Sequence, residues 1–333
     1  MEKRIKDRFS EVILQQVMRA YNISDDQIQL LDGFESFIYE FQRNGQGFIL
    51  RIGHSLRRPE NLIRGELDWI NYLHQGAAGV SRAILAENGE LVVPIEDRSG
   101  DYFMATAFEK AAGGPPKKED MGPKFYEDYG RLSGRMHSLT KTYDPADPSW
   151  KRPGWDDPIM LEVLGWLPES EDKVAQKYID LKNYLDQLPK SNDSYGLIHF
   201  DAHMGNMFID EQGVITLFDF DDCNYSWFVN DIAIVLFYIA MGKDDQAVFT
   251  RVFLEHFLRG YQMENQLDEG WLVEIPSFLK LREIDLYAVI HRSFDVENIT
   301  DPWVAMYMEN RVQRIEDGVP FIDFDFSSLI TKE

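Results

Sequence analysis

The segment from residue 199 to residue 222, HFDAHMGNMFIDEQGVITLFDFDD, limits the possible folds more than any other part of the chain. Two short apolar runs flank the turn signal DEQG, so the sequence predicts a tight β-hairpin. A hairpin returns the chain to where it began, which sets Asn206 and Asp219 side by side, with Asp201 facing them. Oxygen ligands in this arrangement suit a hard divalent cation, such as Mg²⁺, that is held mostly by the phosphates of a substrate.

The first 105 residues have the pattern of a small sheet with helices. Apolar residues from Ile5 to Tyr21 recur at helical spacing, which predicts one amphipathic helix. Short strand-like runs follow, and the turn signals QRNGQG and EDRSGD predict hairpins. Between the strands, PENLIRGELDWINYLHQG has near-helical spacing and a stop signal at Gly76. This pattern predicts a mostly antiparallel sheet with one inserted helix.

The pattern changes after residue 105. The Gly- and Pro-rich stretch 111–124 predicts a loop, and helical patterns dominate later, above all after Asp231. We therefore expect an α+β protein with two lobes. Residues 1–105 would form a small antiparallel-sheet lobe, and residues 106–333 would form a larger, mainly helical lobe.

Composition narrows the classes of partner. Asp and Glu outnumber Lys and Arg by 57 to 34, which gives a net charge of -23. Such an acidic surface repels phosphate backbones and anionic lipids, so neither nucleic acid nor membrane is an expected partner. The N-terminal stretch does not resemble a signal peptide, no apolar run reaches spanning length, and the single cysteine, Cys223, fits a reducing compartment. These features predict a cytoplasmic protein and say nothing of its oligomeric state.

The loop HFDAHMGN, followed by LFDFDD, resembles the family that contains aminoglycoside phosphotransferases, choline kinases, homoserine kinases of the kinase-like type and fructosamine kinases. The pattern of that family is H-x-D-x-x-x-x-N and then a hydrophobic-D-F/W-x segment, similar to the protein-kinase loop. The order of sheet lobe, linker and helical lobe matches over nearly the whole chain. The resemblance implies a two-lobed, protein-kinase-like fold. It also implies an enzyme that transfers the γ-phosphoryl group of ATP or GTP, with Mg²⁺, to a hydroxyl group.

The resemblance implies a role for each residue of the loop. Asp201 would be the catalytic residue that accepts or orients the acceptor hydroxyl, and His199 would brace the loop by hydrogen bonding. Asn206 and Asp219 would bind Mg²⁺. His203 would pack against the loop or contact a phosphate.

Other positions fit the same family. Arg51 occupies the third-strand place where protein kinases keep lysine, and Glu66 in the next helix is its expected ion-pair partner; an ordinary surface pair is the alternative. The phosphate-covering loop keeps one glycine, Gly33, and would use backbone N–H groups with the Ser36 hydroxyl. Asp231 would cap the following helix and tie down the catalytic loop.

The purine and acceptor sites are less defined by the sequence. Backbone groups near Thr106 and Phe108 could bind a purine if FMATAFEKAAGG links the lobes; an inner strand end is the alternative. The acidity of residues 106–333 favours a small, amine-bearing acceptor, similar to an aminoglycoside, choline or homoserine. Residues expected on the acceptor side, each equally well explained as part of a polar face, are Asp222, Tyr225, Trp227, Glu283 and Tyr287.

Three other functions remain open. A protein Ser/Thr kinase would share the fold and the loop. His199, Asp201 and His203 alternate along an extended segment, as ligands of a metal-dependent hydrolase would. Few other His or Glu residues could complete such a site, and zinc sites usually need at least three protein ligands. Arginine in place of lysine at position 51, together with the glycine-poor loop, permits a catalytically silent nucleotide-binding module.

Overall fold

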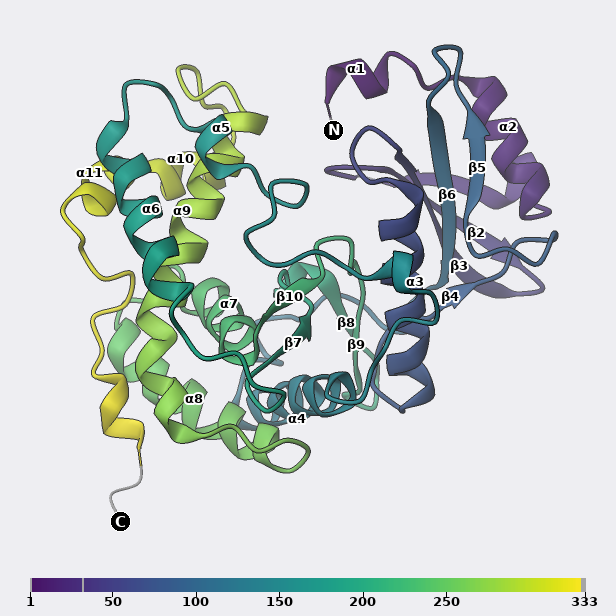
Figure 1. Ribbon diagram of the computed structural model, residues 1–333. Coiled ribbons are helices and arrows are strands. Elements are labelled where there is room, and N and C mark those ends of the chain that lie inside the picture. The colour runs from purple at the N-terminus through teal and green to yellow at the C-terminus, as the bar shows by residue number, and fades with distance from the viewer. Residues whose placement is uncertain (1, 32, 331–333) are drawn as a thin grey trace. The chain divides into compact units, whose positions relative to one another are not determined.

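The structure, a computed structural model, describes residues 2–31 and 33–330 (Figure 1). Contacts divide the chain into two compact units. Unit 1 contains the residues up to 114 together with 143–152 and 208–221, and unit 2 contains 115–142, 153–207 and the residues from 222 onward. The first unit therefore includes two later segments in addition to the sheet region expected at 1–105.

Unit 1 is built on an antiparallel sheet with strand order β1-β2-β3-β6-β4, and β5 also pairs with β6. The turn between β2 and β3 is Asn44–Gly45, whose φ angles of 54° and 77° are the left-handed pair that two-residue hairpins favour. The predicted hairpin is therefore confirmed. The strands are β1 (Ile28–Leu31), β2 (Phe37–Arg43), β3 (Gln46–His54), β4 (Ala83–Ile84), β5 (Val93–Glu96) and β6 (Tyr102–Glu109).

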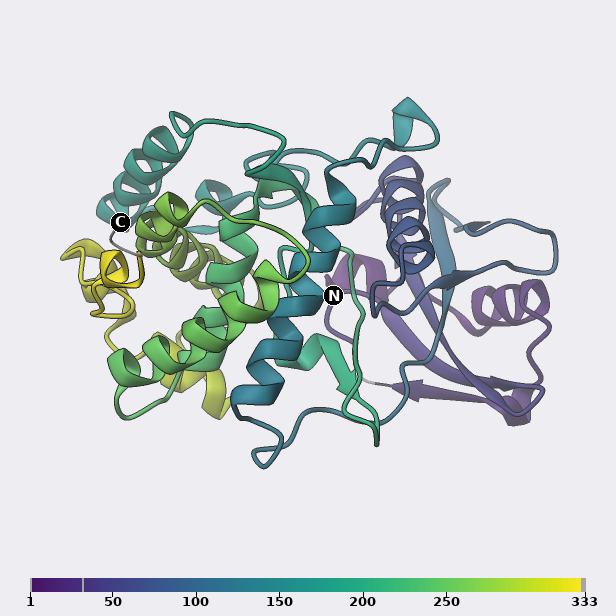
Figure 2. The same ribbon diagram turned by 90° about the horizontal axis from the view of Figure 1, so that it is seen from below.

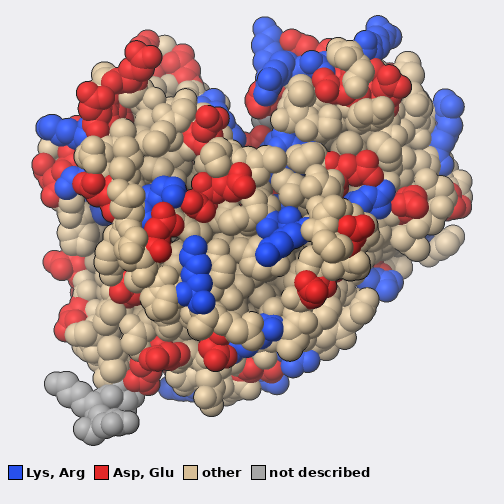
Figure 3. All heavy atoms as spheres, viewed as in Figure 1, with Lys and Arg blue, Asp and Glu red and all other residues tan. Residues whose placement is uncertain are grey.

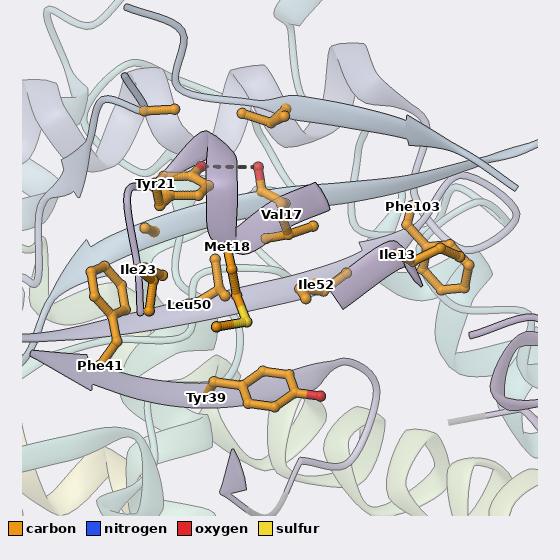
Figure 4. Packing of buried hydrophobic residues seen from close by; sticks show 14 of the residues in the cluster. Ile13, Val17, Met18, Tyr21, Ile23, Tyr39, Phe41, Leu50, Ile52 and Phe103 are labelled. Carbon is orange, nitrogen blue, oxygen red and sulfur yellow. Dashed lines mark hydrogen bonds between the residues drawn. The ribbon is translucent and has the colours of Figure 1, made fainter. Parts of the chain in front are cut away.

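The N-terminal helices pack against this sheet. Ile13 and Val17 of α2 (Glu11–Ala20) belong to one buried apolar cluster with Leu50 of β3 (Figure 4). The Tyr21 hydroxyl donates to the carbonyl of Ala105 at 3.2 Å. The prediction of one continuous helix is wrong, because α1 (Lys3–Lys6) ends early and extended backbone at Ser10 precedes α2.

Helix α3 (Glu60–Gln75) is the inserted helix of unit 1. It follows Pro59 and ends at Gly76, as the sequence predicts. Its buried face includes Glu66 and Trp69, and the Trp69 ring meets Phe220 edge-on at 5.5 Å between centroids. The helix thus holds one side of the segment that carries Asp219.

The predicted hairpin of the loop segment is also confirmed. Strands β8 (Met207–Ile209) and β9 (Ile215–Leu217) pair with each other. Gly213 takes a φ of 81° in the turn. The Leu217 backbone N–H donates to the carbonyl of Gly79 at 2.8 Å, which connects β9 to the earlier residues of unit 1.

Unit 2 is mainly helical. Helices α4 and α8 lie side by side (Figure 2), and glycine permits their close approach, because a Cβ at Gly130 would meet the Phe257 carbonyl oxygen at 1.9 Å. A small sheet of β7 and β10 lies next to α7. The elements of this unit include α4 (Pro123–Thr140), α5 (Val163–Trp166), α6 (Asp172–Leu185), β7 (Tyr195–Ile198), β10 (Asn224–Trp227), α7 (Phe228–Ala240), α8 (Gln246–Gln262), α9 (Ile275–Ser293), α10 (Pro302–Met308) and α11 (Arg311–Glu316). No helix in the described part of the chain is both long enough and apolar enough to cross a membrane.

Candidate active site

The loop after β7 is held in place by the buried carboxylate of Asp231. The Asp231 carboxylate accepts the backbone N–H groups of His199 at 3.1 Å and Phe200 at 2.8 Å, and His137 Nε2 lies 3.1 Å from it. These contacts hold the pKa of Asp231 below its usual range, although burial opposes the shift. Phe200 has a φ of 66°, a backbone conformation that side chains rarely adopt.

Asp231 therefore ties down the loop as expected, but it does not cap the helix. Helix α7 begins at Phe228, with Trp227 at its N-cap, so Asp231 is the fourth helical residue. Its side chain points out of the first turn into the loop that precedes β8, because three donors converge there. Asp231 therefore holds the loop from within helix α7, not from the N-cap position.

Asp201 is half-buried, and both of its carboxylate oxygens are engaged. Oδ1 forms an ion pair with Arg282, while Oδ2 accepts Asn206 Nδ2 at 3.0 Å and lies 3.4 Å from His203 Nε2. Burial raises the pKa of Asp201, but the charge of Arg282 and the contact with His203 outweigh burial and lower it to about 2. The group is therefore a carboxylate at neutral pH, suited to orienting a hydroxyl. His199 supports it, since its Nδ1 accepts the Asp201 backbone N–H at 3.3 Å.

Asn206 is oriented by the same loop. Its amide nitrogen donates to the backbone carbonyl and to Oδ2 of Asp201, each at 3.0 Å. The amide oxygen is consequently the atom with which Asn206 could bind a cation. His203 caps the short 3₁₀ turn Met204–Asn206, because its Nδ1 accepts the Gly205 backbone N–H at 2.9 Å. This contact gives His203 a structural role in the loop.

In unit 1, Arg51 and Glu66 form the expected ion pair, and both side chains are buried. Two guanidinium nitrogens of Arg51 donate to the two carboxylate oxygens of Glu66 at 2.8 and 2.6 Å. The Phe108 ring lies 5.1 Å from the Arg51 guanidinium, and the Thr106 hydroxyl donates to the Arg51 carbonyl at 3.5 Å. A bidentate, stacked guanidinium is a preorganised cation for a phosphate group.

This placement corrects the purine prediction. Thr106 and Phe108 lie inside β6, and Phe108 pairs with both Ile49 of β3 and Ala83 of β4. Their backbone groups belong to the sheet, because β6 continues to Glu109. The alternative of an inner strand end describes them, and their side chains support Arg51.

Further arginines, which were not predicted from the sequence, surround Asp221 in unit 1. Arg57 forms an ion pair with its carboxylate, Arg58 Nε lies 3.8 Å away and Arg51 lies 4.0 Å away. Arg152 also donates to the Asp221 carbonyl at 2.6 Å. The guanidinium charges hold the pKa of Asp221 well below its usual range despite burial. The signal in the sequence was the pair of arginines just before the helix stretch PENLIRGEL.

These residues line a concavity of unit 1. Arg51, Arg57 and Ser36 contribute to its wall. Gly33 shapes the loop beside it, since a Cβ there would meet the Ser36 carbonyl oxygen at 2.3 Å. The concavity combines cationic side chains and a buried hydroxyl with the carboxylate of Asp221, which already pairs with Arg57.

Asp219 lies at the end of the β8–β9 hairpin. Its side chain is 56% exposed, and Oδ1 lies 4.0 Å from an Arg51 nitrogen. Its φ of 63° is the second left-handed conformation of a bulky or acidic residue in this region, after Phe200. An exposed carboxylate is the type of ligand that a hard cation takes. Within residues 2–31 and 33–330, no group of three or more His, Cys, Asp and Glu side chains is arranged to hold a metal ion on its own.

The residues expected on the acceptor side differ in their surroundings. Glu283 is fully buried and forms ion pairs with Lys280 and, at 2.6 Å, with Arg311. Trp227 is buried and donates from its indole N–H to the Pro189 carbonyl at 3.0 Å. These are the contacts of core residues.

The three other residues expected on the acceptor side differ in their exposure. Asp222 and Tyr225 are half-buried, whereas Tyr287 is buried and donates from its hydroxyl to Glu171 at 2.8 Å. The contacts of Arg282 and Tyr238 with the loop were not foreseen: the Tyr238 hydroxyl accepts the same Arg282 nitrogen that meets Asp201, at 2.7 Å. No local pattern indicated them, because both come from helices far along the chain.

Comparisons with known proteins agree with this arrangement. The model of the phosphotransferase enzyme family matches residues 26–271. Amicoumacin kinase of Bacillus subtilis (strain 168) is 40% identical over 335 residues, which cover 99% of each chain. The solved structure of amicoumacin kinase hAmiN in complex with AMP-PNP, Ca²⁺ and Ami has a TM-score of 0.94 and 37% identity, covering 99% of this chain and 100% of that one.

A more distant structure shares the fold alone. A microcompartment-associated aminopropanol kinase has a TM-score of 0.74 and 22% identity, covering 93% of this chain and 98% of its own. The predicted two-lobed, kinase-like α+β fold is thereby confirmed. The family match and the full-length relative also confirm a kinase-type phosphotransferase that acts on a hydroxyl group. The chain belongs to the phosphotransferase enzyme family.

Proposed function

We propose that this enzyme transfers the γ-phosphoryl group of ATP to a hydroxyl group of a small antibiotic of the amicoumacin type. The observation that carries the proposal is the 40% identity with amicoumacin kinase over 99% of both chains. The complex of hAmiN with AMP-PNP supports ATP as the phosphoryl donor, and its Ca²⁺ supports a divalent cation. We propose Mg²⁺ as the physiological ion, because Mg²⁺ commonly binds through one or two protein ligands and substrate phosphates.

In the proposed reaction, the acceptor hydroxyl oxygen bonds to the γ-phosphorus while the bond from that phosphorus to the bridging oxygen of ADP breaks. Asp201 accepts a hydrogen bond from the hydroxyl and aims its oxygen. Because the Asp201 carboxylate is weakly basic, it receives the proton only as the new P–O bond forms. Arg51 holds the phosphates. A divalent cation held by Asn206 and Asp219 would neutralise charge on the triphosphate.

The test is the substitution Asp201→Asn. It removes the charge and basicity of the carboxylate but keeps the shape of the side chain, so ADP release with amicoumacin and Mg-ATP should fall by about 10²–10⁴-fold. Asp180→Asn, in an exposed position of α6, is the control and should match the unmodified enzyme. Turnover of Asp201→Asn near that of the control would overturn the role of Asp201.

A further inference from the structure

Arg282 connects helix α9 to the catalytic loop, although the two lie 81 positions apart in the chain. One terminal nitrogen of its guanidinium donates to Asp201 Oδ1, and the same nitrogen donates to the Tyr238 hydroxyl of α7 at 2.7 Å. Helices α7 and α9 pack against each other, so both ends of this contact belong to the core of unit 2. A hydrogen bond between charged groups is also stronger than one between neutral groups.

Aromatic rings hold the Arg282 guanidinium in this position. Its central carbon lies 5.2 Å from the centre of the Tyr238 ring and 6.0 Å from the centre of the Phe200 ring. The Tyr238 ring also meets the His203 ring, at 4.9 Å between centroids. The Arg282 side chain is only 13% exposed, and the attraction between a guanidinium and an aromatic ring is strongest where water is excluded. Arg282 is therefore a well-fixed donor to the catalytic loop.

The contacts of Asp201 distinguish its two carboxylate oxygens. A carboxylate has about four lone-pair sites, two on each oxygen. Oδ2 accepts Asn206 Nδ2 at 3.0 Å and lies 3.4 Å from His203 Nε2, so each of its two sites faces a donor. In the part of the chain that the structure describes, Oδ1 meets Arg282 alone, and the side chain is 21% exposed. The second site on Oδ1 can therefore accept a hydroxyl group, and Arg282 determines the direction in which that site points.

We propose that Arg282, held by Tyr238, is a positioning residue for the transfer reaction and directs Oδ1 of Asp201 toward the acceptor hydroxyl. The inference rests on the proposed function, because Arg282 acts through Asp201. Without Arg282, only the contacts at Oδ2 would orient the carboxylate, and the terminal torsion of an aspartate side chain is broad. A displacement of about 1 Å between the reacting groups can lower the rate by about 10²-fold.

A purely structural role is the alternative explanation for the same side chain. Arg282 also attracts the carboxyl group of Asp285, which lies one turn further along α9 and is only 2% exposed. If Arg282 served mainly to compensate Asp285, its loss would disturb folding and would lower activity whichever residue occupied position 201. The two roles therefore predict different results when Asp201 is replaced as well.

The test is a double-mutant cycle with Arg282→Met, which keeps a long, flexible side chain but removes its charge and its N–H groups. With amicoumacin and Mg-ATP, the kcat of Arg282→Met should fall by about 10²-fold, while the KM for ATP stays unchanged. In the Asp201→Asn background, the same substitution should lower the remaining kcat by less than about threefold, because the group through which Arg282 acts is already lost. Arg282→Lys keeps the charge and should recover part of the loss. Tyr238→Phe keeps the ring contact and should cause a smaller loss than Arg282→Met.

Arg292→Met is the matched control. Arg292 lies on the same helix, is exposed, and places its guanidinium 4.6 Å from the centre of the Trp166 ring. Its replacement should change neither kcat nor the KM for ATP. A kcat of Arg282→Met near that of this control, or an equal loss from Arg282→Met in both backgrounds, overturns the inference.

Failure of the proposed function gives different results. Full turnover by Asp201→Asn contradicts the role of Asp201 itself. If the unmodified enzyme phosphorylates no amicoumacin, the proposed acceptor is wrong, and the same cycle is measured on ATP hydrolysis, in which water takes the place of the acceptor hydroxyl. If Arg282→Met does not fold, Arg282→Lys and Tyr238→Phe, each alone and combined with Asp201→Asn, decide by the same comparison of backgrounds.

Discussion

At the scale of single residues, the buried pair of Arg51 and Glu66 determines how the guanidinium that we propose to hold the phosphates is oriented. The bidentate contact fixes the guanidinium plane, and Phe108 stacks against it. Burial weakens the charged state of Arg51, but Glu66 and, to a lesser extent, Asp221 raise its pKa well above the usual range. Loss of Glu66 would leave a buried positive charge with only more distant partners.

We therefore expect Glu66→Gln to lower both stability and nucleotide affinity. The free energy of unfolding in urea should fall by about 3 kcal/mol, because a buried charge loses its partner. The KM for ATP should rise by about tenfold, since Arg51 is no longer aligned. Glu60→Gln is the control, because its pair with Arg64 is more accessible to solvent and should contribute less than about 1 kcal/mol. Equal effects of the two substitutions would contradict this account.

The residues of the site were predictable to different degrees for a physical reason. Asp201, Asn206 and Asp219 lie on one continuous loop and hairpin, so their spacing carried the information. Arg51 and Glu66 come from a strand and the next helix, again within one local pattern. Arg282 reaches Asp201 across 81 positions. No periodicity of α9 tells which distant loop its polar face meets, because that depends on how α7 and α9 pack.

At the scale of elements, Asp97 joins the N-terminal segment to the sheet. It lies in the turn between β5 and β6, and its Oδ2 accepts Arg8 at 2.9 Å and lies 3.2 Å from His54 Nε2. Its Oδ1 accepts the backbone N–H groups of Ser99 at 2.6 Å and Asp101 at 3.0 Å. Burial opposes ionisation, but these donors together lower the pKa of Asp97 to about 2.

The stabilisation from Asp97 should depend on pH in a defined direction. Its folded pKa of about 2 lies below the ordinary value of 3.8, so its contribution is present above about pH 4 and disappears as the pH falls towards 2. Asp97→Asn should cost about 2 kcal/mol at pH 7, the scale of lost hydrogen bonds to a charged group. The cost should shrink at pH 3, as measured by urea unfolding. Asp101→Asn, which alters a more exposed contact of Arg8, should cost less; a cost for Asp97→Asn that is independent of pH would refute the mechanism.

The boundaries of helices and strands were predictable where their cause is local in the sequence, and were not predictable where it lies in contacts with distant segments. The turn at Asn44–Gly45 and the end of α3 at Gly76 have local causes, and both were predicted correctly. Periodicity from Ile5 to Tyr21 suggested one helix, because it does not detect the extended backbone at Ser10. The C-terminal end of β6 could not be predicted from its own sequence either. Thr106 and Phe108 stay in the sheet because they belong to a strand that pairs with both β3 and β4.

At the scale of the whole molecule, an excess of negative charge acts on both units. The net charge is -23, and acidic and basic side chains are interspersed over the face drawn in Figure 3. Individual surface pairs contribute little under these conditions. The summed repulsion among unpaired carboxylates disfavours the compact state, and salt screens such repulsion over a Debye length of about 10 Å at 0.1 M.

We therefore expect added salt to stabilise the protein. Raising the ionic strength from about 0.01 M to 0.2 M shortens the screening length severalfold. The gain should be about 1 kcal/mol, which corresponds to about 1–2 °C in Tm for a chain of this size. Differential scanning calorimetry with NaCl and with KCl at equal ionic strength gives the measurement and its control, since screening does not depend on the identity of the cation. A fall in Tm with both salts would show that attractive pairs outweigh the net repulsion.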